Sequence, residues 1–163
     1  MRNSIDIEKV YDLMAQRLFN ISLRIVGNSA DAEEIMHDTL LQYWKSGSNQ
    51  EIIDLRKWLS SVCIRKSIDK LRERNRWKNI LEDYEDPALE ETEETDLEYD
   101  IHTIRNALSS IPDNYRAIVS LRLFEGYDYQ EISQITGITE NTIRSLYMRG
   151  RQKLAAAIRQ IRQ

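Results

Sequence analysis

The sequence predicts an all-α fold of two small helical domains joined by an acidic linker, and three observations support this. Charged residues make up 31% of the 163 residues, with only five glycines and two prolines, a balance typical of helical proteins. Apolar residues recur at spacings of three and four on both sides of the middle of the chain. The middle itself, residues 77–100, is acidic, contains Pro87 and lacks a clear period, which indicates a flexible linker.

The charge distribution explains how a chain with a formal net charge of −4 could bind nucleic acid. Residues 1–76 carry +2, residues 77–100 carry −10 and residues 101–163 carry +4. The acidity therefore belongs to the linker, and it leaves two mildly basic halves. We expect a first domain at residues 1–76, a linker at 77–100 and a second domain at 101–163.

Two amphipathic helices open the first domain. The first is expected at residues 5–26 and ends at Gly27, after which Asn28 and Ser29 begin a second helix at about residues 30–44. The apolar stripe of the first helix comprises Ile7, Val10, Tyr11, Met14, Leu18, Ile21 and Ile25. The inward stripe of the second comprises Ala32, Ile35, Met36, Thr39, Leu40 and Tyr43.

The other side of the second helix is mostly polar. A polar outer face is usually only solvated, but an acidic face with one apolar side chain also suits docking of a basic partner. Both interpretations remain open from the pattern alone. The residues of this face are Glu34, His37, Asp38, Leu41 and Lys45.

A third helix, at about residues 53–76, combines an apolar stripe with a surplus of basic residues. From Leu55 to Arg76 there are eight Lys/Arg against Asp69 and Glu73, and we expect the surplus charge to lack nearby compensating acids. A net charge of +6 on one helix favours phosphate binding over a solvated surface. The stripe comprises Leu55, Trp58, Leu59, Val62, Ile68 and Leu71.

The second domain is expected to hold helices at residues 102–108 and 114–123, followed by a helix-turn-helix at 127–154. Asp128 and Glu131 have the spacing of a capping box, and Gly137 permits a sharp turn that Ile138 anchors in the core. Thr139 can cap the next helix. The inward residues of that helix are Ile143, Leu146, Tyr147, Gly150 and Leu154.

The opposite face of this last helix carries amide, hydroxyl and guanidinium groups. A short helix, a glycine turn and a helix with such an outer face form the pattern that places a helix in the DNA major groove. A surface helix pair without DNA is the simpler alternative. The outer residues are Glu140, Asn141, Arg144, Ser145, Arg149 and Arg151.

The remaining chemistry-bearing residues favour neither catalysis nor metal binding. His37 and His102 are far apart with no cysteine nearby, and no nucleophile, base and orienting acid cluster in the sequence. Cys63 lies between Val62 and Ile64, which predicts a buried structural thiol. There is no long apolar run and no apolar signal core at the N-terminus. We expect a soluble, cytoplasmic protein that is not an enzyme and has no catalytic residue, metal, cofactor or small-molecule substrate.

With these motifs in order, the chain resembles the two-domain extracytoplasmic-function group of RNA polymerase sigma factors in the sigma-70 superfamily. AEEIMHDTLLQYW at residues 32–44 is similar to the region 2 helix that docks on core polymerase. WLSSVCIRKSIDKLRERNR at 58–76 is similar to the helix that opens and holds the −10 element. Residues 107–154 are similar to region 4, which reads the −35 element. The resemblance covers nearly everything except the linker.

The resemblance implies a role for each candidate surface. It implies core RNA polymerase and promoter DNA as partners, and it makes a membrane-associated anti-sigma factor a candidate partner. Polymerase contacts fall on Glu34, Asp38, Leu41 and Gln42. Contacts to the −10 strand fall on Arg56, Lys57, Arg65, Lys66, Lys70 and Arg72. Contacts to the −35 duplex fall on Glu140, Asn141, Thr142, Arg144, Ser145 and Arg149.

Two departures from the family pattern bear on these roles. Arg65 stands where the family often has an asparagine associated with the flipped −10 base, and His37 stands where a glutamine is common. The first leaves the −10 base preference open. The acidic linker could act as a spacer or cover the basic surfaces, and deletion of residues 82–96 distinguishes these.

The predicted function is a promoter-specificity subunit, with two rivals. A stand-alone helix-turn-helix regulator that binds duplex DNA as a dimer accounts for residues 127–154 but leaves the basic helix unexplained. An adaptor without any DNA role would tolerate charge reversal at Arg144 and Arg149.

Overall fold

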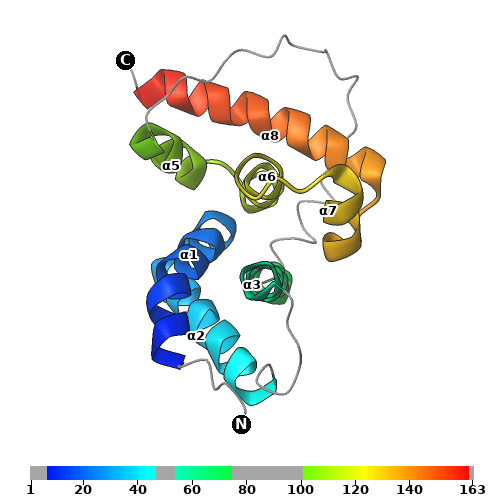
Figure 1. Ribbon diagram of the computed structural model, residues 1–163. Coiled ribbons are helices and arrows are strands. Elements are labelled where there is room, and N and C mark those ends of the chain that lie inside the picture. The colour runs from blue at the N-terminus through cyan, green and yellow to red at the C-terminus, as the bar shows by residue number, and fades with distance from the viewer. Residues whose placement is uncertain (1–6, 47–53, 75–100, 162–163) are drawn as a thin grey trace. The chain divides into compact units, whose positions relative to one another are not determined.

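The computed structural model describes residues 7–46, 54–74 and 101–161, and every regular element in these ranges is a helix (Figure 1). The chain divides into two compact units, residues 1–71 and 72–163. The predicted all-α fold with two helical domains is confirmed. The predicted linker at residues 77–100 lies outside the described residues, as do the first residues of the predicted helix at 5–26 and the last of that at 53–76.

Helices α1 (Ile7–Val26) and α2 (Ser29–Ser46) form a helical hairpin in the first unit. Gly27 has a positive φ of 71°, and its N–H donates to the Leu23 carbonyl at 2.9 Å, which ends α1. The Asn28 side chain then accepts a hydrogen bond from the Asp31 N–H at 3.0 Å and caps α2. A two-residue reversal therefore turns the chain, as the sequence predicted.

The predicted apolar stripes are buried between these helices, with two exceptions on α1. All six inward residues predicted for α2 are buried, as are five of the seven predicted for α1. Ile7, in the first turn, is 37% exposed and Tyr11 is 44% exposed. The Tyr11 ring stacks on the His37 ring of α2 at a centroid distance of 6.3 Å. Tyr11 thus covers the outside of the hairpin instead of entering its core.

Helix α3 (Leu55–Glu73) packs against the hairpin through small side chains that hydrogen-bond across the interface. The Cys63 thiol donates to the Leu18 carbonyl of α1 at 3.3 Å, and the Ser67 hydroxyl donates to the Ser22 hydroxyl at 2.9 Å. Cys63 is fully buried, which confirms it as a structural thiol. The deepest residues of α3 are Leu59, Cys63, Ile64, Ile68 and Leu71, whereas the predicted Leu55, Trp58 and Val62 are half-buried.

The second unit is organised around its last helix, α8 (Glu140–Ile161), which packs along α5 (Ile101–Ser110), α6 (Asp113–Val119) and α7 (Tyr129–Thr136), as Figure 1 shows. A helix is present where the sequence predicted one at 114–123, but only its first half is α-helical. Its second half is a π-helix, η2 (Ser120–Phe124), in which the Glu125 N–H donates to the Ser120 carbonyl at 3.2 Å. The helical periodicity of the sequence does not reveal this wider turn.

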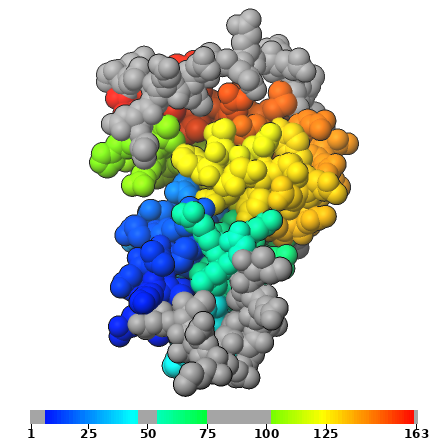
Figure 2. Space-filling view, in the orientation of Figure 1, coloured from blue at the N-terminus to red at the C-terminus, as the bar shows by residue number. Residues whose placement is uncertain are grey.

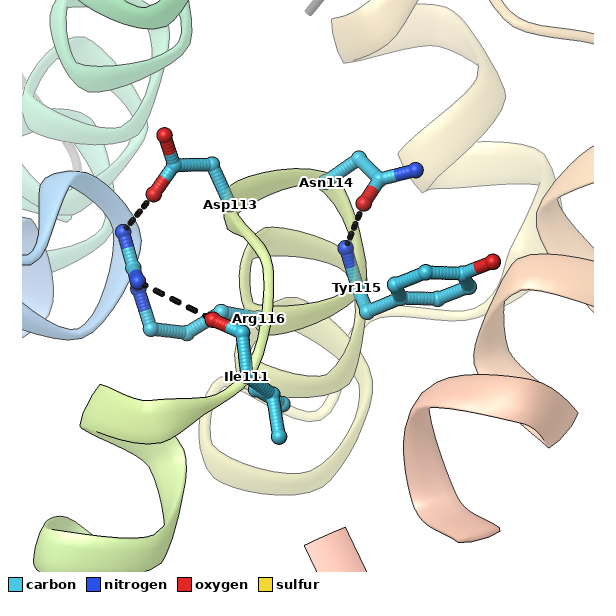
Figure 3. Close-up of polar contacts among 5 residues, drawn as sticks. All are labelled: Ile111, Asp113, Asn114, Tyr115 and Arg116. Atoms are coloured by element: carbon cyan, nitrogen blue, oxygen red, sulfur yellow. Dashed lines mark hydrogen bonds and ion pairs between the residues drawn. The ribbon is translucent and has the colours of Figure 1, made fainter. Parts of the chain in front are cut away.

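A buried arginine fixes the turn between α5 and α6 (Figure 3). Arg116 is 5% exposed, and its guanidinium donates to the Asp113 carboxylate at 2.6 Å and to the Ile111 carbonyl at 3.3 Å. Removing one partner of such a buried pair typically costs about 3–5 kcal/mol, because the other charge is left uncompensated. This arginine is therefore a structural residue, and not part of a basic surface.

Gly150 lets α8 approach α6 more closely than any side chain would allow. A Cβ atom at Gly150 would lie 2.5 Å from the Val119 Cγ2 atom and 3.3 Å from the Tyr115 carbonyl oxygen. Val119 is fully buried and cannot move into solvent. The predicted role of Gly150 as a small inward residue is confirmed, and it sets the spacing of the two helices.

We expect Gly150→Ala to lower the free energy of unfolding by up to about 2 kcal/mol. Overpacking costs about 1–3 kcal/mol. The higher helix propensity of alanine offsets about 1 kcal/mol of this cost. Urea denaturation followed by circular dichroism measures the change. Adding Val119→Ala should relieve the clash introduced by Gly150→Ala, and Ala156→Gly on the exposed side of α8 gives the propensity effect alone. A stabilised Gly150→Ala variant would contradict the close approach.

Candidate nucleic-acid interface

The helix-turn-helix begins with the predicted capping box. The Glu131 N–H donates to the Asp128 carboxylate at 2.8 Å, and the Asp128 N–H donates to the Glu131 carboxylate at 3.3 Å. Two N–H groups without intrahelical partners are thereby satisfied at the start of α7. The orientation of α7 is fixed at its first turn.

The turn between α7 and α8 also follows the sequence prediction. Gly137 ends α7 in the left-handed region at φ 74°, where a side chain would be strained. Ile138 is 8% exposed, and its carbonyl accepts a hydrogen bond from the Ser133 hydroxyl at 2.6 Å. The predicted cap of α8 is weaker, because the Thr142 N–H lies 3.5 Å from the Thr139 hydroxyl.

One face of helix α8 packs into the core and the other faces outward. Ser145 was predicted on the outward face but is buried. Its hydroxyl donates to the Asn141 carbonyl one turn earlier at 3.1 Å. The prediction that Ser145 lies on the outer face is therefore wrong, since its hydroxyl is occupied by the backbone. Glu140, Asn141 and Arg144 are exposed, and Thr142, Arg149 and Arg151 are half-buried.

An aromatic cluster beside this outer face was missed by the sequence analysis. The guanidinium carbon of Arg144 lies 5.3 Å from the centroid of the Tyr129 ring, at the start of α7. The guanidinium carbon of Arg122, from η2, lies at the same distance from that ring. Tyr147 meets Tyr129 edge to face at 6.1 Å. Helical spacing carries no information about these pairings, because they join three different elements.

The basic residues of α3 lie largely on its accessible side. Arg56, Lys57, Arg65 and Arg72 are exposed, while Lys66 and Lys70 are half-buried. The sequence suggested that the surplus charge lacks nearby acids, and this is wrong for Lys70, whose ammonium lies 3.9 Å from the Glu34 carboxylate of α2. Glu34 lies about 36 positions earlier, on α2, so a count of charges along α3 does not include it. A partly exposed pair of this kind contributes only about 0–1 kcal/mol.

The outer face of α2 carries the predicted mixture of acidic and apolar groups. Its side chains Glu34, His37, Asp38, Leu41 and Gln42 are all exposed. Leu41 is 43% exposed, and Trp44, which the sequence analysis did not assign to this face, is 59% exposed. Exposed large apolar side chains ringed by polar ones are typical of a protein-binding surface.

Within residues 7–46, 54–74 and 101–161, no three His, Cys, Asp or Glu side chains are grouped as a metal site would require. In the same ranges, none of the helices has the length and apolar character needed to cross a membrane.

Comparison with known families assigns each unit. Residues 10–77 match the family model of sigma-70 region 2, and residues 101–154 match that of sigma-70 region 4. The first match contains α2 and α3 with their acidic and basic faces, and the second contains the helix-turn-helix.

Named relatives and one solved structure agree with these matches. The chain is 30% identical over 145 residues to the ECF RNA polymerase sigma factor SigE of Mycolicibacterium smegmatis, covering 86% of this chain but 56% of that protein. It is 21% identical over 155 residues to the ECF RNA polymerase sigma factor SigM of Bacillus subtilis, covering 92% and 93%. The fold is similar to that of the sigma factor RpoE, co-crystallised with the anti-sigma factor NepR from Bartonella quintana. The TM-score is 0.60 at 21% identity, over 94% and 97% of the two chains.

The two caps of the helix-turn-helix should differ in their contribution to stability. We expect Asp128→Ala to lower the free energy of unfolding by about 1 kcal/mol, as loss of a well-made cap does. Thr139→Ala is the matched comparison, and it should cost less because its hydrogen bond is long. Thermal unfolding of both variants measures the difference, and equal losses would contradict the geometry.

Proposed function

Because the chain belongs to the sigma-70 family, in its extracytoplasmic-function group, we propose that it acts as a promoter-specificity subunit. It binds core RNA polymerase and directs initiation at promoters with −35 and −10 elements. The observation that carries this proposal is the pairing of two family segments in one chain. One holds acidic and basic helical faces, and the other holds the helix-turn-helix.

The second unit reads the −35 duplex through the outer face of α8. Arg144 and Asn141 are exposed near the start of that helix, the end that contacts base edges when a recognition helix enters the major groove. Guanidinium pairs well with guanine, and a carboxamide pairs well with adenine. Glu140, Thr142 and Arg149 adjoin them as further contacts to bases or phosphates. Ser145 is left out, since its hydroxyl is buried and bonded to the backbone.

The first unit binds the −10 strand through the basic face of α3. Lys and Arg side chains hold the phosphates of a single strand and make its binding dependent on salt. Binding to the open strand shifts the duplex equilibrium toward melting, so that no nucleotide hydrolysis is required. The residues proposed for this role are Arg56, Lys57, Arg65, Lys66, Lys70 and Arg72.

The outer face of α2 docks on core polymerase. Glu34 and Asp38 supply negative charge for a basic partner, and the exposed Leu41 supplies an apolar contact beside Gln42. Charge complementarity of this kind steers encounter, while the apolar contact slows dissociation. The proposal places the protein in the cytoplasm with the polymerase, and it includes a membrane-associated anti-sigma factor as a regulator.

The deciding experiment is transcription in vitro with core RNA polymerase, with and without this protein, on a pool of genomic promoter fragments. New start sites that depend on the protein support the proposal and provide the −35 and −10 sequences. Dimeric binding to duplex DNA with no polymerase association and no new starts would favour the stand-alone regulator instead.

We expect Arg144→Ala to weaken −35-dependent initiation by about 1–3 kcal/mol if the guanidinium contacts a base edge. The loss should be confined to one base position, measured with single-base variants of a −35 element recovered from the promoter pool. Ser145→Ala is the neighbouring control and should change initiation less than about twofold, because that hydroxyl faces the backbone. An equal loss on every −35 variant would make Arg144 a phosphate contact.

We expect Asp38→Lys to slow association with core polymerase by about tenfold at low salt, since it reverses a charge on the docking face. The effect should shrink as salt rises. Glu33→Lys makes the same charge change at another exposed position of α2, outside the proposed contacts. Stopped-flow binding measures both rates. Equal slowing by the two variants would indicate a general charge effect rather than a docking site.

A further inference from the structure

Tyr129 brings together groups from three elements next to the proposed −35 surface. It is the first residue of α7, and it is contacted by Arg122 from η2 and by Arg144 and Tyr147 from α8. These elements adjoin on one surface of the second unit, shown in yellow to orange in Figure 2. Neither Tyr129 nor Arg122 was among the site residues predicted from the sequence.

The two guanidiniums differ in how firmly the protein holds them. Arg122 is half-buried, and its guanidinium donates to the Tyr127 carbonyl at 3.4 Å. Arg144 is exposed on α8. The Tyr129 ring therefore lies between a half-buried cation on the protein side and an exposed cation on the proposed DNA-binding side.

We propose that Tyr129 is a specificity-determining positioning residue, whose ring holds the Arg144 side chain in place for −35 recognition. Arg122 and Tyr147 fix the ring itself. This inference rests on the proposed function, since it concerns how Arg144 reads the −35 element. It adds a residue outside the recognition helix to the determinants of specificity.

The physical reason is the mobility of an exposed arginine. A free arginine side chain loses much rotamer freedom when it forms a fixed hydrogen-bond pattern. A ring face within about 6 Å attracts the guanidinium and limits its motion before DNA arrives. Preorganisation of this kind lowers the cost of ordering on binding. It should act most strongly on the one base that Arg144 recognises.

A first test needs no DNA. In the full-length protein, NMR relaxation of the Arg144 Nε–Hε group reports its mobility, and Arg144→Lys identifies the signal. Tyr129→Leu removes the ring, and it should lower the order parameter of that group clearly below the wild-type value. Tyr129→Phe keeps the ring and should preserve it. An unchanged order parameter in Tyr129→Leu would overturn the proposal.

A second test uses the holoenzyme in transcription from a recovered promoter and its single-base −35 variants. Tyr129→Leu should reduce discrimination between the recovered −35 element and its single-base variants by about two- to fivefold. The loss should fall at the same base position as for Arg144→Ala. In the Arg144→Ala background, Tyr129→Leu should have little further effect, because the two residues act as a unit. With Arg149→Ala, which removes a guanidinium that is not over this ring, the effects should add.

The outcomes separate this inference from the proposed function. If Arg144→Ala leaves −35 discrimination unchanged, the proposed role of Arg144 fails, whatever Tyr129 does. If Arg144→Ala reduces discrimination but Tyr129→Leu adds to it fully, the positioning role is overturned. Equal losses from Tyr129→Phe and Tyr129→Leu would make the hydroxyl a direct DNA contact. If Tyr129→Leu lowers the melting temperature, Tyr129→Met, which also lacks a ring, replaces it in both tests.

Discussion

The close approach of α8 to α6 at Gly150 is the constraint on which the second unit depends. Because α8 is a single helix of 22 residues, the spacing set at Gly150 also sets the position of its first two turns. Ile143 and Leu146, fully buried in those turns, fix the rotation of the helix about its axis. The direction in which Arg144 leaves the surface is therefore decided by packing contacts on the opposite side of the same helix.

Small side chains have the equivalent role in the first unit. Cys63 and Ser67 place α3 against α1 through hydrogen bonds to Leu18 and Ser22, so these two buried polar side chains are paired across the interface. Small polar and larger apolar side chains occupy that side of α3, and the long basic side chains are left on the accessible side. One packing arrangement thus buries the thiol and presents the cations.

Local rules explain how much of this structure could be predicted from sequence. The capping box at Asp128, the glycine turn at Gly137 and the inward stripe of α2 were all correct, because each depends on residues within four positions of one another. Periodicity failed at Ser145, which is buried. Ser145 has helical spacing suited to the outer face, yet its hydroxyl turns back to the Asn141 carbonyl.

The candidate site was harder to predict than the fold, because several of its contacts join elements that are distant in sequence. The side chains predicted for these surfaces are exposed or half-buried except for Ser145, as helical phase indicated. Their roles in binding stay predictions. The internal connections of these surfaces were not predicted, because Lys70 pairs with Glu34 and Tyr129 with Arg122 across elements that are distant in sequence. The π-helical turn in η2 is a third case, as it depends on hydrogen bonds five residues apart that no apolar pattern encodes.

The two proposed DNA surfaces differ in how they hold their cations, and this difference suits their tasks. On α8 the exposed Arg144 lies over the Tyr129 ring, which Arg122 and Tyr147 also contact, and this favours a fixed hydrogen-bond pattern with one base. On α3 the exposed Arg56, Lys57 and Arg65 lie along one helix. Phosphates of a single strand require charge more than fixed geometry. We therefore expect discrimination between promoters to depend most on the second unit, and salt-dependent affinity to depend most on the first.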